Sequence, residues 1–281
     1  MESTNELFGK VLSADSHLVN LKGNMGGLSL RGRETNLISL FAQSGKIISI
    51  VPQMVGNGPN FIVCEKLPDA NISLPDDEWG IVDGHLRVPG FPTIDLKNTN
   101  KFDSYEKSEV SDFPGHMEKA IAFVVRKDIS KSETELKIRL LRLAKVLKQY
   151  DVESVEIPII DLLGFGDDKF KIGDVAICAM LLTARSFVAG KRFKIGWYNR
   201  FIMEIRRFLH RTNAVGKNWI EYALEGRTTE TQQHFFKAMV EDFEYKDEMA
   251  VKVVEKSHVY NGRAFLIGAN AVLEMIRERF L

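Results

Sequence analysis

Basic and aromatic side chains are interleaved over residues 191–219, KRFKIGWYNRFIMEIRRFLHRTNAVGKNW. This stretch holds eight Lys or Arg residues and one carboxylate, in a chain whose 38 basic and 38 acidic residues balance. Arginine presents planar sets of N–H donors that fit phosphate oxygens, and exposed aromatic rings can stack on bases or lie at a lipid interface. The stretch therefore predicts a local anion-binding surface, because the overall charge supplies no attraction to a polyanion. The residues expected to contact the anion are Lys191, Arg192, Lys194, Trp197, Arg200, Arg206, Arg207, Arg211 and Lys217.

Residues 198–211 are expected to form the helix that presents this surface. Its apolar residues recur at the spacing of one helical face: Phe201, Ile205, Phe208 and Leu209. A second face combines arginines with one acid: Arg200, Glu204, Arg207 and Arg211. The alternative interpretation is a packed amphipathic helix whose arginine face is merely solvated.

A second candidate site is the loop of residues 161–168, DLLGFGDD, in which Asp161, Asp167 and Asp168 accompany two glycines. The sequence predicts a strand over residues 152–160 before this loop and a helix over residues 175–182, capped by Asp174, after it. In α/β folds ligands bind just past the carboxyl ends of strands. The carboxylates could hold a divalent cation, but a turn followed by a helix cap is the interpretation that we favour.

This strand, loop and helix resemble the second half of a macrodomain. The resemblance implies a fold that binds ADP-ribose, with residues 161–168 as the ligand loop. The chain departs from the family at Gly23–Gly27, where the asparagine-rich loop expected after an Asp-bearing strand is missing.

Other residues with catalytic or metal-binding chemistry lie outside known frames. Cys64 and Cys178 are far apart among apolar neighbours, which predicts buried, reduced thiols. The glycines near residues 23–27 lack the spacing of a phosphate-cradling loop and predict a hairpin or loop instead. The six histidines are scattered, and no Gly-x-Ser-x-Gly elbow accompanies them. We therefore expect no cofactor and no metal, and we favour a non-enzymatic protein.

Proline placement divides the chain, because seven of the eight prolines lie between Pro52 and Pro114 and the last is Pro158. Proline interrupts helices, so the first half favours strands and turns and the second permits long helices. Strands are expected at residues 17–21, 37–41, 46–51, 61–64, 80–88, 92–96, 119–126 and 152–160. Residues 7–12 fit a strand or a short helix, and residues 97–114 an exposed loop.

The second half shows helical spacing. After a possible capping box at residues 132–135, a leucine stripe predicts a helix that ends near residue 150: Leu136, Leu140, Leu143 and Leu147. Its lysines and arginines make it a second basic element, although solvated charges on a surface helix are the interpretation that we favour. Further helices are expected at residues 218–224, 229–243, 247–256 and 262–280. Aromatic residues of the second of these, from Phe235 to Phe243, form a face typical of core or of an oligomer contact.

The fold class is therefore α+β, with a β-rich half before a mainly helical half. We expect residues 1–128 to form a β-rich region with acidic, proline-rich loops and residues 129–281 to form a mainly helical region. The strand predicted at residues 152–160 could pair back into the first sheet. No secretory signal and no apolar run of spanning length is evident, so an intracellular location, in cytoplasm or nucleus and at most peripheral to membranes, is expected.

The leading functional hypothesis is a binding and assembly protein that contacts nucleic acid, single-stranded RNA foremost, or an anionic membrane surface, and that forms homo-oligomers. Matrix, nucleocapsid and movement proteins of RNA viruses combine these properties. The segment GHMEKAIAFVVRKD is similar to the central strand of the 30K movement proteins, and we assign no family on it. The alternatives are an α/β enzyme or nucleotide-binding module that uses residues 161–168, and a structural adaptor that binds a partner through the face from Phe235 to Phe243 and whose basic helix is merely solvated.

Overall fold

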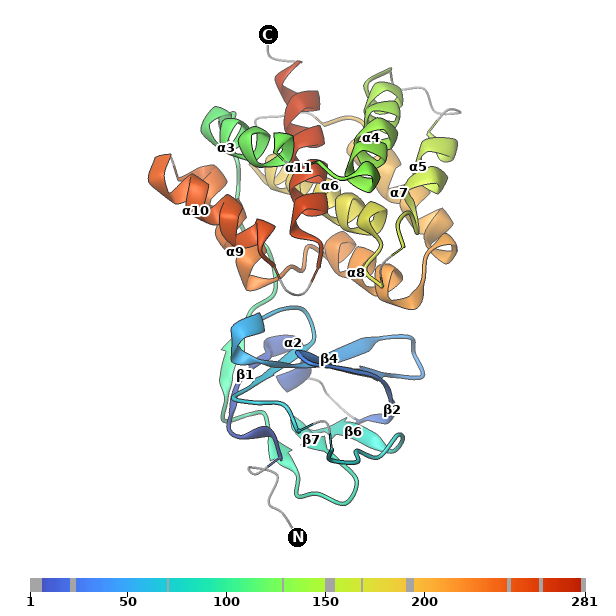
Figure 1. The fold of residues 1–281 in the computed structure, drawn as a ribbon, viewed down its shortest axis with the longest axis vertical. Coiled ribbons are helices and arrows are strands. Elements are labelled where there is room, and N and C mark those ends of the chain that lie inside the picture. The colour runs from blue at the N-terminus through green and yellow to red at the C-terminus, as the bar shows by residue number, and fades with distance from the viewer. Residues whose placement is uncertain are drawn as a thin grey trace. The chain divides into compact units, whose positions relative to one another are not determined.

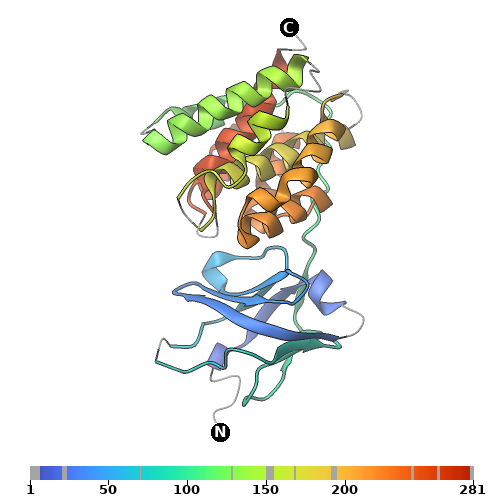
Figure 2. The same cartoon turned by 90° about the vertical axis from the view of Figure 1, so that its right-hand side faces the viewer.

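The computed structural model describes residues 7–20, 24–69, 71–127, 129–149, 155–167, 169–190, 195–241, 244–257 and 260–278, with backbone only at residues 24 and 244–246. The chain has a β-rich half followed by helices, as predicted (Figures 1 and 2). Two compact units are present. Unit 1 comprises residues 1–104 and 228–230, and unit 2 comprises residues 105–227 and 231–281. The division thus falls at Ser104/Tyr105 rather than at the expected residue 128.

Among the described residues, unit 1 forms a curled sheet of nine strands with the order β8-β7-β6-β2-β3-β4-β5-β1-β9. Neighbouring strands are antiparallel except for the parallel pairs β4–β5 and β1–β9. A short helix, α2 (Ser16–Val19), follows β1. The strands are β1 (Val11–Asp15), β2 (Asn24–Glu34), β3 (Leu37–Phe41), β4 (Ile47–Pro52), β5 (Phe61–Cys64), β6 (Trp79–Val82), β7 (His85–Arg87), β8 (Ile94–Asp95) and β9 (Asn100–Phe102).

Three expectations for this unit are wrong. Residues 16–19 form helix α2 instead of a strand, because the Asp15 carboxylate accepts the backbone N–H of His17 and starts a helical turn. The glycine-rich stretch forms strand β2, which pairs with β3 on one side and β6 on the other, so backbone pairing outweighs its low strand propensity. Within residues 97–114, strand β9 pairs with β1. The paired strands at residues 37–41 and 46–51 are confirmed.

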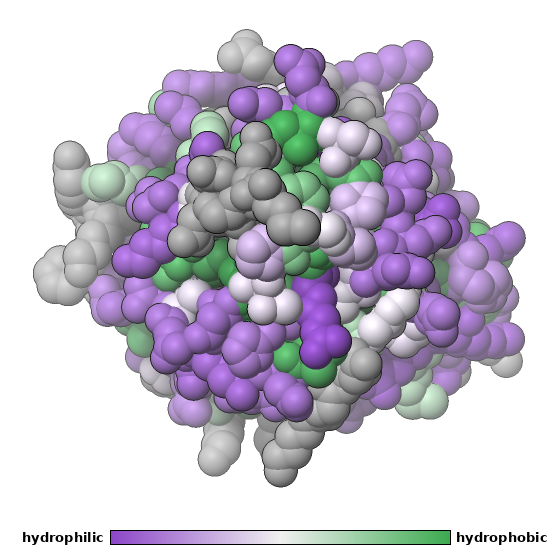
Figure 3. Space-filling view, turned by 90° about the horizontal axis from the view of Figure 1, so that it is seen from below, coloured by the Kyte–Doolittle hydropathy of each residue, from purple (hydrophilic) through white to green (hydrophobic). Residues whose placement is uncertain are grey.

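One face of the sheet curls around an apolar core that includes Leu40, Ile50 and Trp79, all fully buried. Where β1 ends, the buried Asp15 carboxylate also accepts the backbone N–H of Asn60 at 2.6 Å and thereby links β1 to the start of β5. Burial raises the pKa of the Cys64 thiol to about 12, the nearby Glu65 charge adding to the effect. Figure 3 shows one face of the molecule, on which hydrophilic residues predominate and hydrophobic ones gather in a smaller area near the middle.

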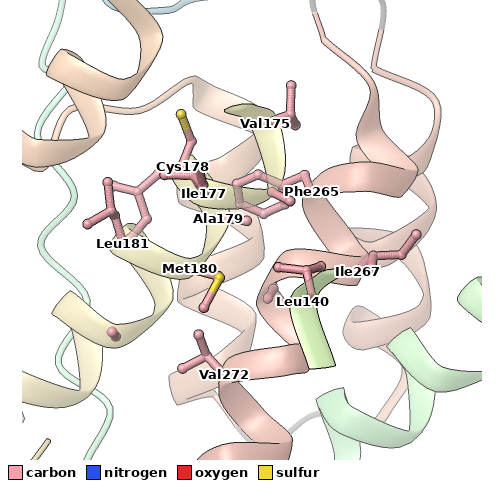
Figure 4. Packing of buried hydrophobic residues seen from close by; sticks show 14 of the residues in the cluster. Leu140, Val175, Ile177, Cys178, Ala179, Met180, Leu181, Phe265, Ile267 and Val272 are labelled. Carbon is pink, nitrogen blue, oxygen red and sulfur yellow. The ribbon is translucent and has the colours of Figure 1, made fainter. Parts of the chain in front are cut away.

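Unit 2 is helical, with helix α6 packed most extensively against α11 and α8. Its elements are α3 (Gly115–Arg126), α4 (Lys131–Gln149), α5 (Glu156–Leu162), α6 (Ile172–Ala189), α7 (Tyr198–Phe208), the 3-10 turn η2 (Leu209–Arg211), α8 (Ala214–Glu225), α9 (Glu230–Val240), α10 (Glu244–Glu255) and α11 (Gly262–Arg277). Gly268 permits the close α6–α11 approach, because a Cβ there would collide with the Ala176 carbonyl. Figure 4 shows Phe265 of α11 beside Ile177 and Ala179 of α6.

Helix α6 has the length and composition of a membrane-spanning segment, and 83% of it is buried inside the protein. The two strands that the sequence predicts in this unit are helices in the described residues. Residues 119–126 belong to α3, and residues 156–160 belong to α5; residues 152–154 lie outside the described part. The resemblance of residues 115–128 to a movement-protein strand therefore fails. Phe235, Phe236 and Met239 of α9 are core residues, and Phe243 is outside the described part.

Candidate nucleic-acid interface

Helix α7 forms as the sequence predicts, with its apolar side turned into the core of unit 2. Phe201 and Ile205 are fully buried, and Phe208 is 8% exposed. Trp197, just before the helix, is 3% exposed and meets Phe201 edge to face, with the ring centroids 5.8 Å apart. Burial of these rings fixes the rotation of α7, and its polar side therefore faces outward.

The outward side of α7, the 3-10 turn η2 and the first turn of α8 carry five cations that the structure describes. We call them the arginine surface: Arg200, Arg206, Arg207, Arg211 and Lys217. All are exposed except Arg200, whose side chain is 37% exposed and held close to the protein. Lys191, Arg192 and Lys194, which the sequence also nominates, lie outside the described residues. Trp197 belongs to the core and cannot stack on a base.

Two of the five cations are held by carboxylates. The nearly buried Glu204 accepts a charge-assisted contact from Arg200 Nη2 at 2.7 Å and lies 3.5 Å from Arg207 Nη1. Arg207 Nη1 also lies 3.4 Å from Glu156 Oε2 on α5, and its guanidinium packs 4.9 Å from the Phe208 ring centroid. These contacts orient Arg207 while leaving its side chain 61% exposed. The shared face of Arg200, Glu204 and Arg207 that the sequence predicts is confirmed.

The other three cations are unpaired within the part of the chain that the structure describes. Arg206, Arg211 and Lys217 are exposed and have no ion-pair partner there. An arginine or lysine that makes no internal pair keeps its full charge available to a ligand. Met203, 60% exposed, lies on the same side of α7, three residues after Arg200 and four before Arg207. Its helical spacing was visible in the sequence, although its exposure was not.

A buried carboxylate, Asp174 of α6, holds the elements under this surface together. It accepts the backbone N–H of Gly164 at 2.8 Å and the hydroxyl of Thr212, which follows η2. Burial raises the pKa of Asp174 above its ordinary value of 3.8, although these hydrogen bonds and the Lys171 charge act in the opposite direction. Gly216 of α8 packs so closely that a Cβ would collide with this carboxylate. Asp174 was expected as a helix cap, but Lys171 occupies that position.

The first turn of α8 is fixed by a side-chain cap. Asn213 Oδ1 accepts the backbone N–H of Gly216 at 2.8 Å, and its Nδ2 donates to the Lys169 carbonyl at 3.1 Å. The loop before α6 is thereby tied both to α8 and, through Asp174, to the residues that follow η2. Together these bonds place Arg211 and Lys217 on one rigid support.

The described part of the loop of residues 161–168 has a structural role, because Gly164 donates its backbone N–H to Asp174. Gly164 adopts a φ of 73°, and Asp161 lends its backbone carbonyl to Arg139 Nη1 at 2.6 Å. A helix, α5, precedes the loop, so the strand-loop arrangement on which the macrodomain resemblance depends is absent there. Asp167 is exposed, and Asp168 is outside the described part. Among the described residues, no three His, Cys, Asp or Glu side chains are grouped as a metal site.

Comparison with known proteins gives no relative: no protein-family model, no curated protein and no solved structure matches the chain.

Proposed function

We propose that the protein is a non-enzymatic nucleic-acid-binding and assembly protein that contacts the phosphates of single-stranded RNA through the arginine surface. The main supporting observation is that Arg206, Arg211 and Lys217 are exposed and unpaired within the described part. Asp174 and Asn213 join the segments that carry Arg211 and Lys217. Matrix, nucleocapsid and movement proteins of RNA viruses act in this way, and we place the chain in that functional class.

The burial of the aromatic residues supports phosphate contacts over base contacts. Trp197 and Phe208 face the core and leave few rings for base stacking. Arginine forks and a lysine contact phosphate oxygens regardless of sequence, and binding releases counterions. Affinity is therefore expected to depend steeply on salt and little on RNA sequence.

The orientation of α7 favours nucleic acid over a membrane surface. A helix that lies in a membrane interface turns its apolar face outward into the lipid. In α7 the apolar face is buried. Among the described residues, Met203 is the one strongly exposed apolar residue of the helix, and it lies on the polar side. Anionic vesicles are thus a competing ligand that the binding experiment must include.

The test is a titration of fluorescent single-stranded RNA and, separately, of anionic vesicles, followed by anisotropy and by co-sedimentation. The variant is Arg206→Gln/Arg211→Gln/Lys217→Gln, because these side chains make no internal pair among the described residues and their loss leaves the buried Glu204 paired. The matched control is Lys131→Gln/Arg142→Gln/Lys145→Gln, three exposed cations of α4.

We expect RNA affinity to fall at least roughly thirtyfold in the arginine-surface variant, since each lost phosphate contact removes about 0.7 units of salt dependence and its share of affinity. The α4 control should lose far less. Equal losses in both variants, or binding of vesicles in preference to RNA, would refute the proposal.

A further inference from the structure

Helix α11 lies between α3 and α4 (Figure 1), and residues of all three helices line a groove. Two ion pairs give the directions of its walls: Arg263 at the start of α11 meets Glu133 early in α4, and Arg277 at its end meets Glu118 early in α3. Helix α4 thus runs with α11, and α3 runs against it. The groove encloses about 260 Å³, and its apolar lining includes Val125, Leu140, Leu141, Ala144, Ile267 and Ala271.

The groove carries charged side chains of both signs. Arg126 and Lys137 line it, and Lys137 Nζ donates to the Val125 carbonyl at 2.6 Å. Glu274 also lines it, as do Lys148 and Glu278, which form an ion pair with each other. On α11, Asn270 Nδ2 donates to Glu274 Oε1 at 2.8 Å, while the buried Asn270 Oδ1 has no hydrogen-bond partner among the described residues. An apolar floor flanked by charged side chains of both signs favours an occupant that brings apolar side chains together with a carboxylate and a cation.

Helix α10 carries a ridge with matching properties. Met249 and Val253, one turn apart, are 55% and 45% exposed. Beside them Glu248 and Lys252 are exposed and form an ion pair of 3.5 Å, with the acid first along the helix. The opposite side of α10, with Val251 and Val254, is fully buried. The ridge therefore presents two apolar side chains, one carboxylate and one ammonium donor.

We propose that the Met249/Val253 ridge of one copy of the chain docks in the α3–α4–α11 groove of a second copy. Glu248 would face Arg126 and Lys137, and Lys252 would face Glu274. A volume of about 260 Å³ lies below the roughly 300–1,000 Å³ of small-molecule sites and suits side chains of a helix laid in a groove. The ridge and groove are different surfaces, so each added copy leaves one of each free, which gives a head-to-tail assembly.

This inference deepens the assembly part of the proposed function, and its test needs no nucleic acid. Sedimentation velocity of the full chain is measured over a range of concentrations for wild type, Met249→Glu and Leu141→Glu; Leu141 is 62% exposed, so both charges enter at exposed positions. The average sedimentation coefficient of the wild type should rise as the protein concentration rises. Each variant should weaken association at least roughly tenfold, as expected for a charge placed in an interface centre.

Mixing the two variants separates head-to-tail contact from other modes. Met249→Glu retains a working groove and Leu141→Glu a working ridge, so the mixture should form dimers and stop there. Arg126→Glu should weaken association, and adding Glu248→Arg to the same chain should restore it. The control Ile157→Glu, on an α5 side chain that is 69% exposed, should associate like wild type.

Monomeric wild type at every concentration, an equal loss in Ile157→Glu, or a mixture without dimers would overturn the proposal. Circular dichroism confirms the fold of each variant. Binding of an RNA too short for two copies is measured in parallel, and it should be unchanged in Leu141→Glu. If assembly fails while RNA binding is intact, only the ridge-and-groove proposal is wrong. If RNA binding fails while assembly is intact, only the proposed RNA-binding function is wrong.

Discussion

Single buried carboxylates decide how the arginine surface is held. Asp174 has two hydrogen-bond donors, from Gly164 and Thr212, and no basic side chain in direct contact among the described residues. Glu204 lies between Arg200 and Arg207 and cancels part of their charge. One carboxylate thus supports the surface and the other weakens its field, so substitutions at these two positions should have opposite consequences for binding.

Replacing Asp174 with Ala should lower the free energy of unfolding by about 2–3 kcal/mol, because a buried N–H and a hydroxyl lose their acceptor. Asp174→Asn should cost less. Because burial raises the pKa of Asp174 in the folded state, its favourable contribution is complete below the unfolded pKa near 3.8 and is lost as pH rises through the folded value. Urea titrations from pH 4 to 7 should show wild type losing stability relative to Asp174→Asn; a constant difference would contradict this assignment.

Replacing Glu204 with Gln should strengthen RNA binding about threefold, since one charge roughly 7 Å from a phosphate contributes about 0.6 kcal/mol in water. The amide keeps an oxygen that can accept from Arg200. Anisotropy with the same RNA measures the change. The matched control is Glu135→Gln, which removes an exposed carboxylate that pairs with Arg139 on α4. Weaker binding in Glu204→Gln would show that the arginines need the carboxylate for orientation more than they suffer from its charge.

At the scale of elements, spacing predicts better than composition. KAIAFVVR has the β-branched and aromatic residues of a strand, yet Met117, Ile121, Val124 and Val125 recur at helical spacing and are the buried apolar residues of α3. Helix α7 is a second example, because the helical spacing of its apolar residues predicts which side carries the arginines. Burial of Trp197 and the contacts of Asp174 depend on packing between distant segments, and no local pattern reports them.

The capping box of α4 lies two residues earlier than the sequence predicts, for a comparable reason. The reciprocal capping box is Ser130 with Glu133: Glu133 N–H donates to Ser130 Oγ at 3.2 Å, and Ser130 N–H donates to Glu133 Oε2 at 2.9 Å. The same carboxylate accepts Arg263 Nε of α11 at 2.7 Å. Sequence shows candidate Ser-x-x-Glu frames, but the arginine that selects one lies 130 residues away.

Glu133 should therefore matter more than an ordinary cap. Ser130→Ala is expected to cost about 1 kcal/mol. Glu133→Ala is expected to cost about 2 kcal/mol, because Arg263 loses one of its two carboxylate partners and keeps Glu255 at 3.1 Å. Burial acts to raise the pKa of Glu133, but hydrogen bonds from Arg263 and Ser130 outweigh it and hold the pKa below 4.5. Stability from Glu133 is thus present above the unfolded pKa and lost as pH falls through the folded value. Acid titration of Glu133→Gln against wild type checks this, and a parallel response would contradict it.

At the scale of the molecule, the two units have separate apolar cores. Separate cores predict two unfolding steps rather than one. Ile50→Ala, in the sheet, and Phe265→Ala, in the helical unit, should each lower the free energy of unfolding of its own unit by about 3–4 kcal/mol. Each substitution should therefore lower the midpoint temperature of one step and leave the other step unchanged. Differential scanning calorimetry resolves the steps. A single transition shifted by both substitutions would show that the units unfold together.

The central claim is that Arg206, Arg211 and Lys217 contact phosphates, and the salt dependence of RNA affinity tests it most directly. The slope of log affinity against log salt is measured for wild type and for Arg206→Gln/Arg211→Gln/Lys217→Gln. Each phosphate contact on a single strand contributes a slope of about −0.7, so the variant should be shallower by about 2. An unchanged slope, with or without a change in affinity, would show that RNA does not bind at the arginine surface.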